Sequence, residues 1–159
     1  MERIASDVMT REVFTASPDL SLIDLERELT SRGISGAPVV DEGRLVGVVS
    51  RTDVDRLIAE GEEPPGDDET YFWAPDLATK QRELTTHLDR SRVALERFAD
   101  HCVRDVMTSS VISVGPADPV TDVARLMTER RVHRILVVED DQLVGLISAF
   151  DLVGLLAGR

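Results

Sequence analysis

The residues best suited to chemistry form two copies of a Ser-x-x-Asp motif, Ser50 to Asp53 and Ser148 to Asp151. In each copy an apolar run typical of a strand ends at the serine, and a helical pattern begins there. The two carboxylate oxygens can accept from adjacent hydroxyl groups of a ligand, while the serine hydroxyl and the first helical amides can donate to an anion. The same spacing is that of a helix capping box. Both roles remain open, and they can coexist.

The motif occurs twice because the chain repeats itself. Shifted by 98 positions, residues 4–54 align without a gap with residues 102–152, and 17 of the 51 pairs are identical. The longest identical stretches are Asp7–Thr10 with Asp105–Thr108 and Leu45–Gly47 with Leu143–Gly145. Such self-similarity indicates two copies of one structural unit.

Each repeat is predicted to begin with a short strand and a helix. The strands are expected over residues 13–15 and 111–113. In the second repeat Asp118 and Pro119 predict a helix start, with the aspartate as N-cap and the proline at the first helical position. In the first repeat Leu20 occupies the N-cap position and gives a weaker signal, whereas Gly33 is well placed to end the helix.

A hairpin and a second helix follow in each repeat. The apolar runs 37–40 and 45–49 flank a plausible turn at 41–44, and the second repeat has the same plan around 139–142. The last helices begin near the two motif serines. The fold class is therefore α/β, with the order β-α-β-β-α twice. A unit of this kind cannot bury both its faces alone, so we expect the repeats to pack with pseudo-twofold symmetry.

In order and spacing, these motifs resemble the CBS domain. The resemblance rests on segments in both repeats, which are 7–10, 37–41, 45–53, 132–138 and 143–151. It implies a tandem pair, or Bateman module, that binds AMP, ADP, ATP or S-adenosylmethionine in clefts between the repeats. It implies no other cofactor.

The resemblance also implies roles for individual residues. Each motif aspartate would bind the ribose diol, and the opening segment of the other repeat would supply the adenine slot. His133 and Arg134 would contact phosphate, whereas the first repeat has Ser35 and Gly36 there, so we expect unequal clefts and favour the one with Asp151. The predicted nucleotide-binding residues are Thr10, Val13, Phe14, Ser35, Ser50, Thr52, Asp53, Thr108, Val111, Ile112, His133, Arg134, Ser148 and Asp151. The alternatives are that Val13, Val111 and Ile112 are core residues and that Arg134 is an exposed strand-edge residue.

An insert separates the repeats, which gives predicted boundaries of 1–60, 61–100 and 101–159. Its acidic Pro/Gly stretch, 61–70, is typical of a solvated linker. The aromatic cluster Tyr71–Trp73 and a helical stripe from Leu84 to Cys102 follow. These apolar groups predict either packing on the same module or a homodimer contact.

Composition argues against several functions. The formal charge of -12 opposes binding to nucleic acid or to an anionic membrane. The sequence shows no metal-ligand spacing, no Gly-rich phosphate loop before a helix and no nucleophile with an evident base. We therefore expect that the protein is not an enzyme. With one cysteine, no signal-peptide pattern and no apolar run long enough for a bilayer, we also expect it to be cytoplasmic.

The leading hypothesis is a regulatory nucleotide-binding module, which we expect to form a homodimer and to have an unidentified protein partner. The alternative is a ligand-independent homodimeric interaction scaffold.

Overall fold

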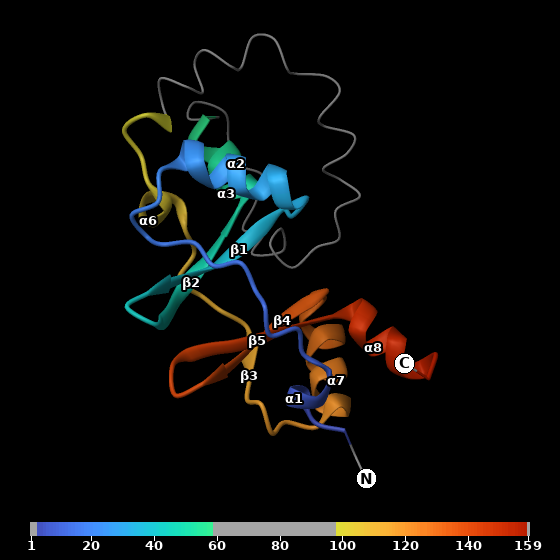
Figure 1. Cartoon of the computed structure of the whole chain (residues 1–159). Coiled ribbons are helices and arrows are strands. Elements are labelled where there is room, and N and C mark those ends of the chain that lie inside the picture. The colour runs from blue at the N-terminus through green and yellow to red at the C-terminus, as the bar shows by residue number, and fades with distance from the viewer. Residues whose placement is uncertain (1–2, 59–97, 159) are drawn as a thin grey trace.

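The computed structural model describes residues 3–58 and 98–158. The first repeat contributes the elements α1 (Ala5–Val8), α2 (Leu22–Arg32), β1 (Gly36–Asp41), β2 (Arg44–Ser50) and α3 (Arg51–Ile58). The second contributes α6 (Val103–Val106), β3 (Ser113–Val114), α7 (Val120–Arg130), β4 (Arg134–Glu139), β5 (Gln142–Ser148) and α8 (Ala149–Leu156). Figure 1 shows one repeat above the other, with the hairpins meeting between them. The α/β class is confirmed.

Both predicted hairpins are present. The antiparallel pairs β1–β2 and β4–β5 have matching registers, and each shifts by one residue at the same place, between Val39 and Val40 and between Val137 and Val138. The turn residues Glu42 and Gly43 have φ of 46° and 83°, and Asp140 and Asp141 have φ of 50° and 63°. Two-residue turns with positive φ at both positions match the natural twist of a hairpin.

The first strand of each repeat is shorter than predicted and lies later in the chain. In the second repeat it comprises only Ser113 and Val114, which pair in parallel with β4. In the first repeat only a single bridge forms, between Ala16 and Val39. The segments 13–15 and 111–112 are therefore not strands, because they belong to the connection that crosses between the repeats.

The predicted helix starts were wrong by one residue. Ser21, not Leu20, is the N-cap of α2, since its side chain accepts from the Asp24 amide at 3.1 Å. Pro119, not Asp118, precedes α7. The Asp118 carboxylate instead accepts from the Gly115 amide at 2.7 Å and so stabilises the turn before the helix. Gly33 does end α2, with a φ of 64°.

The opening segment of each repeat packs on the other repeat. The amides of Ala5 and Ser6 donate to the carbonyls of Asp118 and Pro116. At the positions 98 residues away, the amides of Val103 and Arg104 donate to Leu20 and Pro18, and the bond lengths of all four lie between 2.8 and 2.9 Å. Figure 1 shows α1 among the elements of the second repeat and α6 among those of the first.

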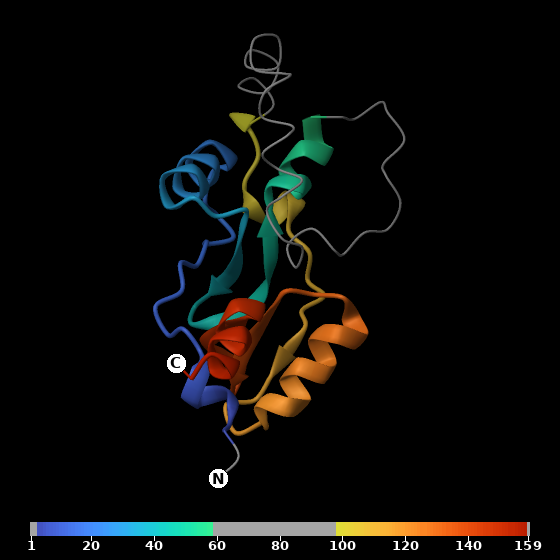
Figure 2. The ribbon, with the colours of Figure 1, turned by 90° about the vertical axis from the view of Figure 1, so that its right-hand side faces the viewer.

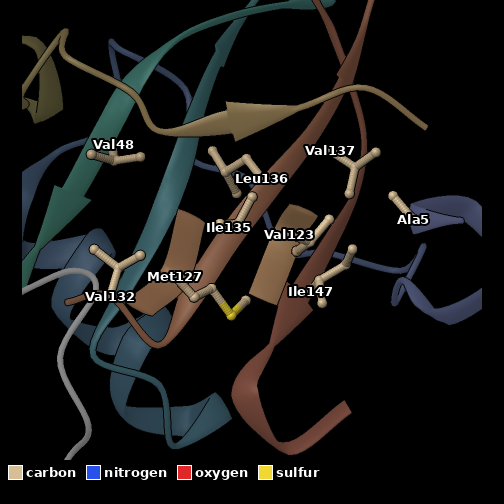
Figure 3. Close-up of a cluster of buried hydrophobic side chains, with 9 residues drawn as sticks. All are labelled: Ala5, Val48, Val123, Met127, Val132, Ile135, Leu136, Val137 and Ile147. Carbon is tan, nitrogen blue, oxygen red and sulfur yellow. The ribbon is translucent and has the colours of Figure 1, made fainter. Parts of the chain in front are cut away.

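As a result, each of the two hydrophobic cores contains residues of both repeats. Figure 3 shows the cluster of the second repeat, in which Ala5 and Val48 of the first repeat lie among its own buried aliphatic residues. Val103 of the second repeat is likewise buried with Leu22, Leu25 and Leu29 of the first. Removing apolar surface from water drives folding, so neither core is complete without the opening segment of the other repeat. The predicted single pseudo-twofold module therefore agrees with the packing.

The predictions for the acidic stretch, the aromatic cluster and most of the helical stripe lie outside the described residues. At the end of that stripe, Phe98 packs against the first repeat's core and Cys102 is half-buried.

Candidate functional site

Both Ser-x-x-Asp motifs form capping boxes at strand-to-helix junctions. At the end of β2, the Ser50 amide and hydroxyl each donate to Asp53 Oδ2 at 2.7 Å. At the end of β5, the Ser148 amide and hydroxyl donate to Asp151 Oδ2 at 2.7 and 2.6 Å. The capping role weighed from the sequence is thus confirmed, and it fixes the orientation of each carboxylate.

The cap leaves one carboxylate oxygen for other partners. Each serine hydroxyl directs its single proton to Oδ2, so it could donate to a phosphate only after releasing the carboxylate. The two free oxygens differ in their surroundings. Asp53 Oδ1 lies 3.8 Å from Arg56 Nη1, whereas Gly154 occupies the equivalent place near Asp151.

Burial affects the charge of Asp53. Only 12% of its side chain is exposed. Burial raises the pKa of this carboxyl, and the hydrogen bonds from Ser50 and the charge of Arg56 partly offset the rise. The Ser50 bonds therefore help to keep Asp53 ionised and able to accept from a ligand.

The crossed opening segments run beside these junctions. Thr10 and Leu146 exchange two backbone hydrogen bonds of 2.9 Å, and Thr108 and Val48 do the same. Leu146 lies two residues before Ser148, and Val48 lies two residues before Ser50. The strand that leads into each Ser-x-x-Asp motif is thus bonded to the opening segment of the other repeat.

Two glycines allow this close approach. A Cβ at Gly47 would lie 2.5 Å from the Thr108 carbonyl oxygen. A Cβ at Gly145 would lie 2.5 Å from Met9 Sδ and 3.0 Å from the Thr10 carbonyl oxygen. A larger residue at Gly47 would push the opening segment away from the strand, whereas one at Gly145 would first displace the flexible Met9 side chain.

Four residues predicted for the adenine slot lie farther along these segments. Phe14 packs against the core of the first repeat, and the Arg32 guanidinium lies 4.4 Å from its ring centre. Val111 and Ile112 pack against the core of the second repeat. Val13 is half-buried. Val111 and Ile112 thus contact the core, as in the alternative weighed from the sequence, and the adenine-binding role of Phe14 and its neighbours stays a prediction.

The predicted phosphate-binding residues take separate positions. Arg134 is half-buried, and its Nη1 donates across the repeats to Ser35 Oγ at 3.4 Å. It is therefore not an exposed strand-edge arginine. His133 is exposed and lines a groove between α7 and α8, while Thr52 is half-buried on α3.

Sequence reasoning missed the contacts of three arginines in the first repeat. Arg56 lies beside Asp53, Arg51 contacts α2, and Arg32 covers Phe14. The i to i+3 spacing of Asp53 and Arg56 was a usable signal. The contacts of Arg51 and Arg32 join separate elements and had no local signal.

Residues 3–58 and 98–158 support neither a metal site nor a membrane-spanning helix. No group of three or more His, Cys, Asp or Glu residues there could hold a metal ion. No helix in this part of the chain is long and apolar enough to cross a membrane.

A scan against protein-family models matches the CBS domain at residues 5–60 and again at residues 103–158. The chain belongs to the CBS domain family. The crossed openings and paired hairpins described above are thus the architecture of a tandem CBS pair.

Relatives and solved structures agree with this assignment. The uncharacterized protein MJ1426 of Methanocaldococcus jannaschii is 31% identical over 94% of this chain and 89% of its own length. The CBS domain of a CBS-domain-containing membrane protein from Sphaerobacter thermophilus is 27% identical, with a TM-score of 0.69 over 97% of this chain and 88% of that one. CBSX2, solved in complex with AMP, is 26% identical, with a TM-score of 0.67 over 98% of both chains. Several other relatives are longer, and this CBS pair spans less than half of their length.

Proposed function

We propose that this CBS pair is a regulatory module that binds an adenine nucleotide, senses energy or metabolite state in the cytoplasm, and has no catalytic activity of its own. The observation that carries the proposal is that the strand before each capped aspartate pairs with the opening segment of the other repeat. A ligand held there would contact both repeats and so would favour one arrangement of them over another. The AMP complex of CBSX2 supports an adenine nucleotide as the ligand class.

Within this proposal, the Asp151 cleft is the stronger of the two. No cation among the described residues pairs with Asp151, whereas Arg56 competes for the free oxygen of Asp53. Arg134 supplies a guanidinium that can donate two parallel bonds to a phosphate. Its bond to Ser35 is long at 3.4 Å and would be exchanged for a stronger, charge-assisted one.

Calorimetry with AMP, ADP, ATP and S-adenosylmethionine tests the proposal. Absence of heat with all four at millimolar concentration would refute it. Asp151→Asn keeps an acceptor for the Ser148 amide but places an NH2 group toward the ribose, so we expect AMP affinity to fall by about 1–3 kcal/mol. Asp53→Asn is the matched control and should change that affinity less. Equal affinity in the wild type and both variants would move the ribose elsewhere.

A second candidate function is a ligand-independent homodimeric interaction scaffold. It rests on α8, where Phe150, Val153 and Leu156 are exposed by 86%, 58% and 90%. Exposed apolar residues grouped on one helix mark association surfaces. Light scattering with and without AMP separates the two functions, because the scaffold predicts a dimer that neither binds nor responds to AMP. Leu156→Glu should disperse such a dimer with little effect on the stability of the monomer.

A further inference from the structure

A groove between α7 and α8 is present in the second repeat and filled in the first. Figure 2 shows these two helices flanking one face of the second repeat. The groove is open to solvent and has a volume of about 380 Å³, within the range of small-molecule sites. Its wall is formed by Ala124, Met127 and Thr128 of α7 and by Ala149 and Leu152 of α8.

In the first repeat, an arginine side chain occupies the equivalent space between α2 and α3. Arg51 Nη2 donates to Thr30 Oγ1 at 2.9 Å, and its Nε lies 3.8 Å from Glu26 Oε2. The second repeat has Ala149 at the position of Arg51 and Ala124 at the position of Glu26. Two alanines thus replace the ion pair, and the space that it fills is left as an apolar groove.

At the edge of the groove, in contrast, it is the second repeat that carries the basic side chains. The exposed residues Arg131 and His133 line it, where the first repeat has Gly33 and Ser35. Arg131 has a φ of 54°, a backbone conformation that costs an arginine more than the glycine at the same place in the first repeat. Neither side chain forms a hydrogen bond or ion pair with another described residue.

We propose that this groove binds a small organic anion with a hydrocarbon body, at a site separate from the nucleotide clefts. The hydrocarbon would lie against Met127 and Leu152, where it would displace water from apolar surface. The anionic group would lie at the exposed edge, where the Arg131 guanidinium can donate two parallel bonds and His133 a third. The filled groove of the first repeat cannot take such a ligand.

Octanoate is a suitable probe, with 1-octanol as its uncharged control. Titration of the full chain, followed by NMR of the methionine and alanine methyl groups, should shift Met127, Ala124 and Ala149. Arg131→Gly copies the first repeat at a position where glycine is unstrained, and it should weaken octanoate about tenfold while changing 1-octanol little. Equal weakening of both compounds, or octanoate binding that leaves these methyl groups unmoved, would overturn the proposal.

A second variant tests the filling of the groove. The double variant Ala124→Glu with Ala149→Arg reproduces the pair that fills the first repeat, and it should abolish binding of octanoate and of 1-octanol. Retained octanoate binding in a folded double variant would contradict the proposal. So would a wild-type dimer that binds no octanoate and dissociates in the double variant, because a second copy would then be the occupant. AMP titration of the same samples reports on the nucleotide clefts separately.

Discussion

Positions 51 and 149 are equivalent in the two repeats, yet one holds an arginine in contact with the neighbouring helix and the other an alanine beside a groove. The same contrast recurs at the aspartates, where Arg56 accompanies Asp53 and Gly154 stands near Asp151. The backbone bonds that join the repeats, in contrast, are matched pair for pair, apart from one bond that the Leu45 amide donates to the Asp141 carbonyl. The duplicated seam between the repeats is therefore largely preserved, and the repeats differ in the side chains between their helices and beside the motif aspartates.

The largest expected effect tests the seam. Gly47→Ala sets a Cβ against the Thr108 backbone, which cannot yield as a side chain does, so we expect the free energy of unfolding to fall by about 3 kcal/mol. Gly145→Ala should cost less, about 1–2 kcal/mol, because its nearest neighbour is the flexible end of Met9. Urea unfolding measures both. Gly154→Ala is the control, with nothing within 4 Å and an expected gain of roughly 0.5 kcal/mol. Wild-type stability in Gly47→Ala would mean that the seam is not packed as described.

The next effect concerns the ion pair of the first repeat. Arg51→Ala removes the bond to Thr30 and leaves Glu26 without that cation, so we expect a loss of about 2 kcal/mol. Burial already raises the pKa of Glu26, and Arg51 opposes the rise. The double variant Arg51→Ala with Glu26→Ala should recover more than half of the loss in a double-mutant cycle. Additive losses would show that the pair is not coupled.

The capping serines give a smaller effect. Ser50→Ala and Ser148→Ala each remove an N-cap acceptor and a bond to the aspartate, and each should cost about 1 kcal/mol in thermal or urea unfolding. Ser50→Ala should cost the more of the two, because Asp53 has only 12% of its side chain exposed and loses one of the bonds that keep it ionised. Ser109→Ala, at an exposed position, controls for loss of a hydroxyl. A larger loss in Ser148→Ala would reverse this ranking.

The smallest effect is a pH dependence in the first repeat. Because burial raises the pKa of Asp53, the folded chain takes up a proton before the unfolded chain does as the pH falls. At pH values above the pKa of Asp53 in the folded chain, burying the ionised carboxylate lowers the free energy of unfolding. This loss disappears as the pH falls through that pKa. The stability of the wild type relative to Asp53→Asn should therefore rise as the pH is lowered from neutrality toward the ordinary range of a carboxyl. A difference independent of pH would contradict the burial described here.

Much of the fold was determined by short stretches of sequence. The turns, the glycine that ends α2 and the Ser-x-x-Asp caps depend on neighbours within a few residues, so local patterns could predict them. The repeat is visible in the sequence itself, because the two copies still share 17 of 51 residues. The errors at Ser21 and Pro119 were errors of one position.

Contacts between distant segments were decided only by the tertiary structure. The placement of Phe14 against its own repeat, the reach of Arg134 to Ser35 and the filling of one groove by Arg51 each join residues from separate elements. Their positions follow from how whole helices and strands pack. The sequence thus specified the local elements and their caps, and packing decided which of these elements and side chains meet.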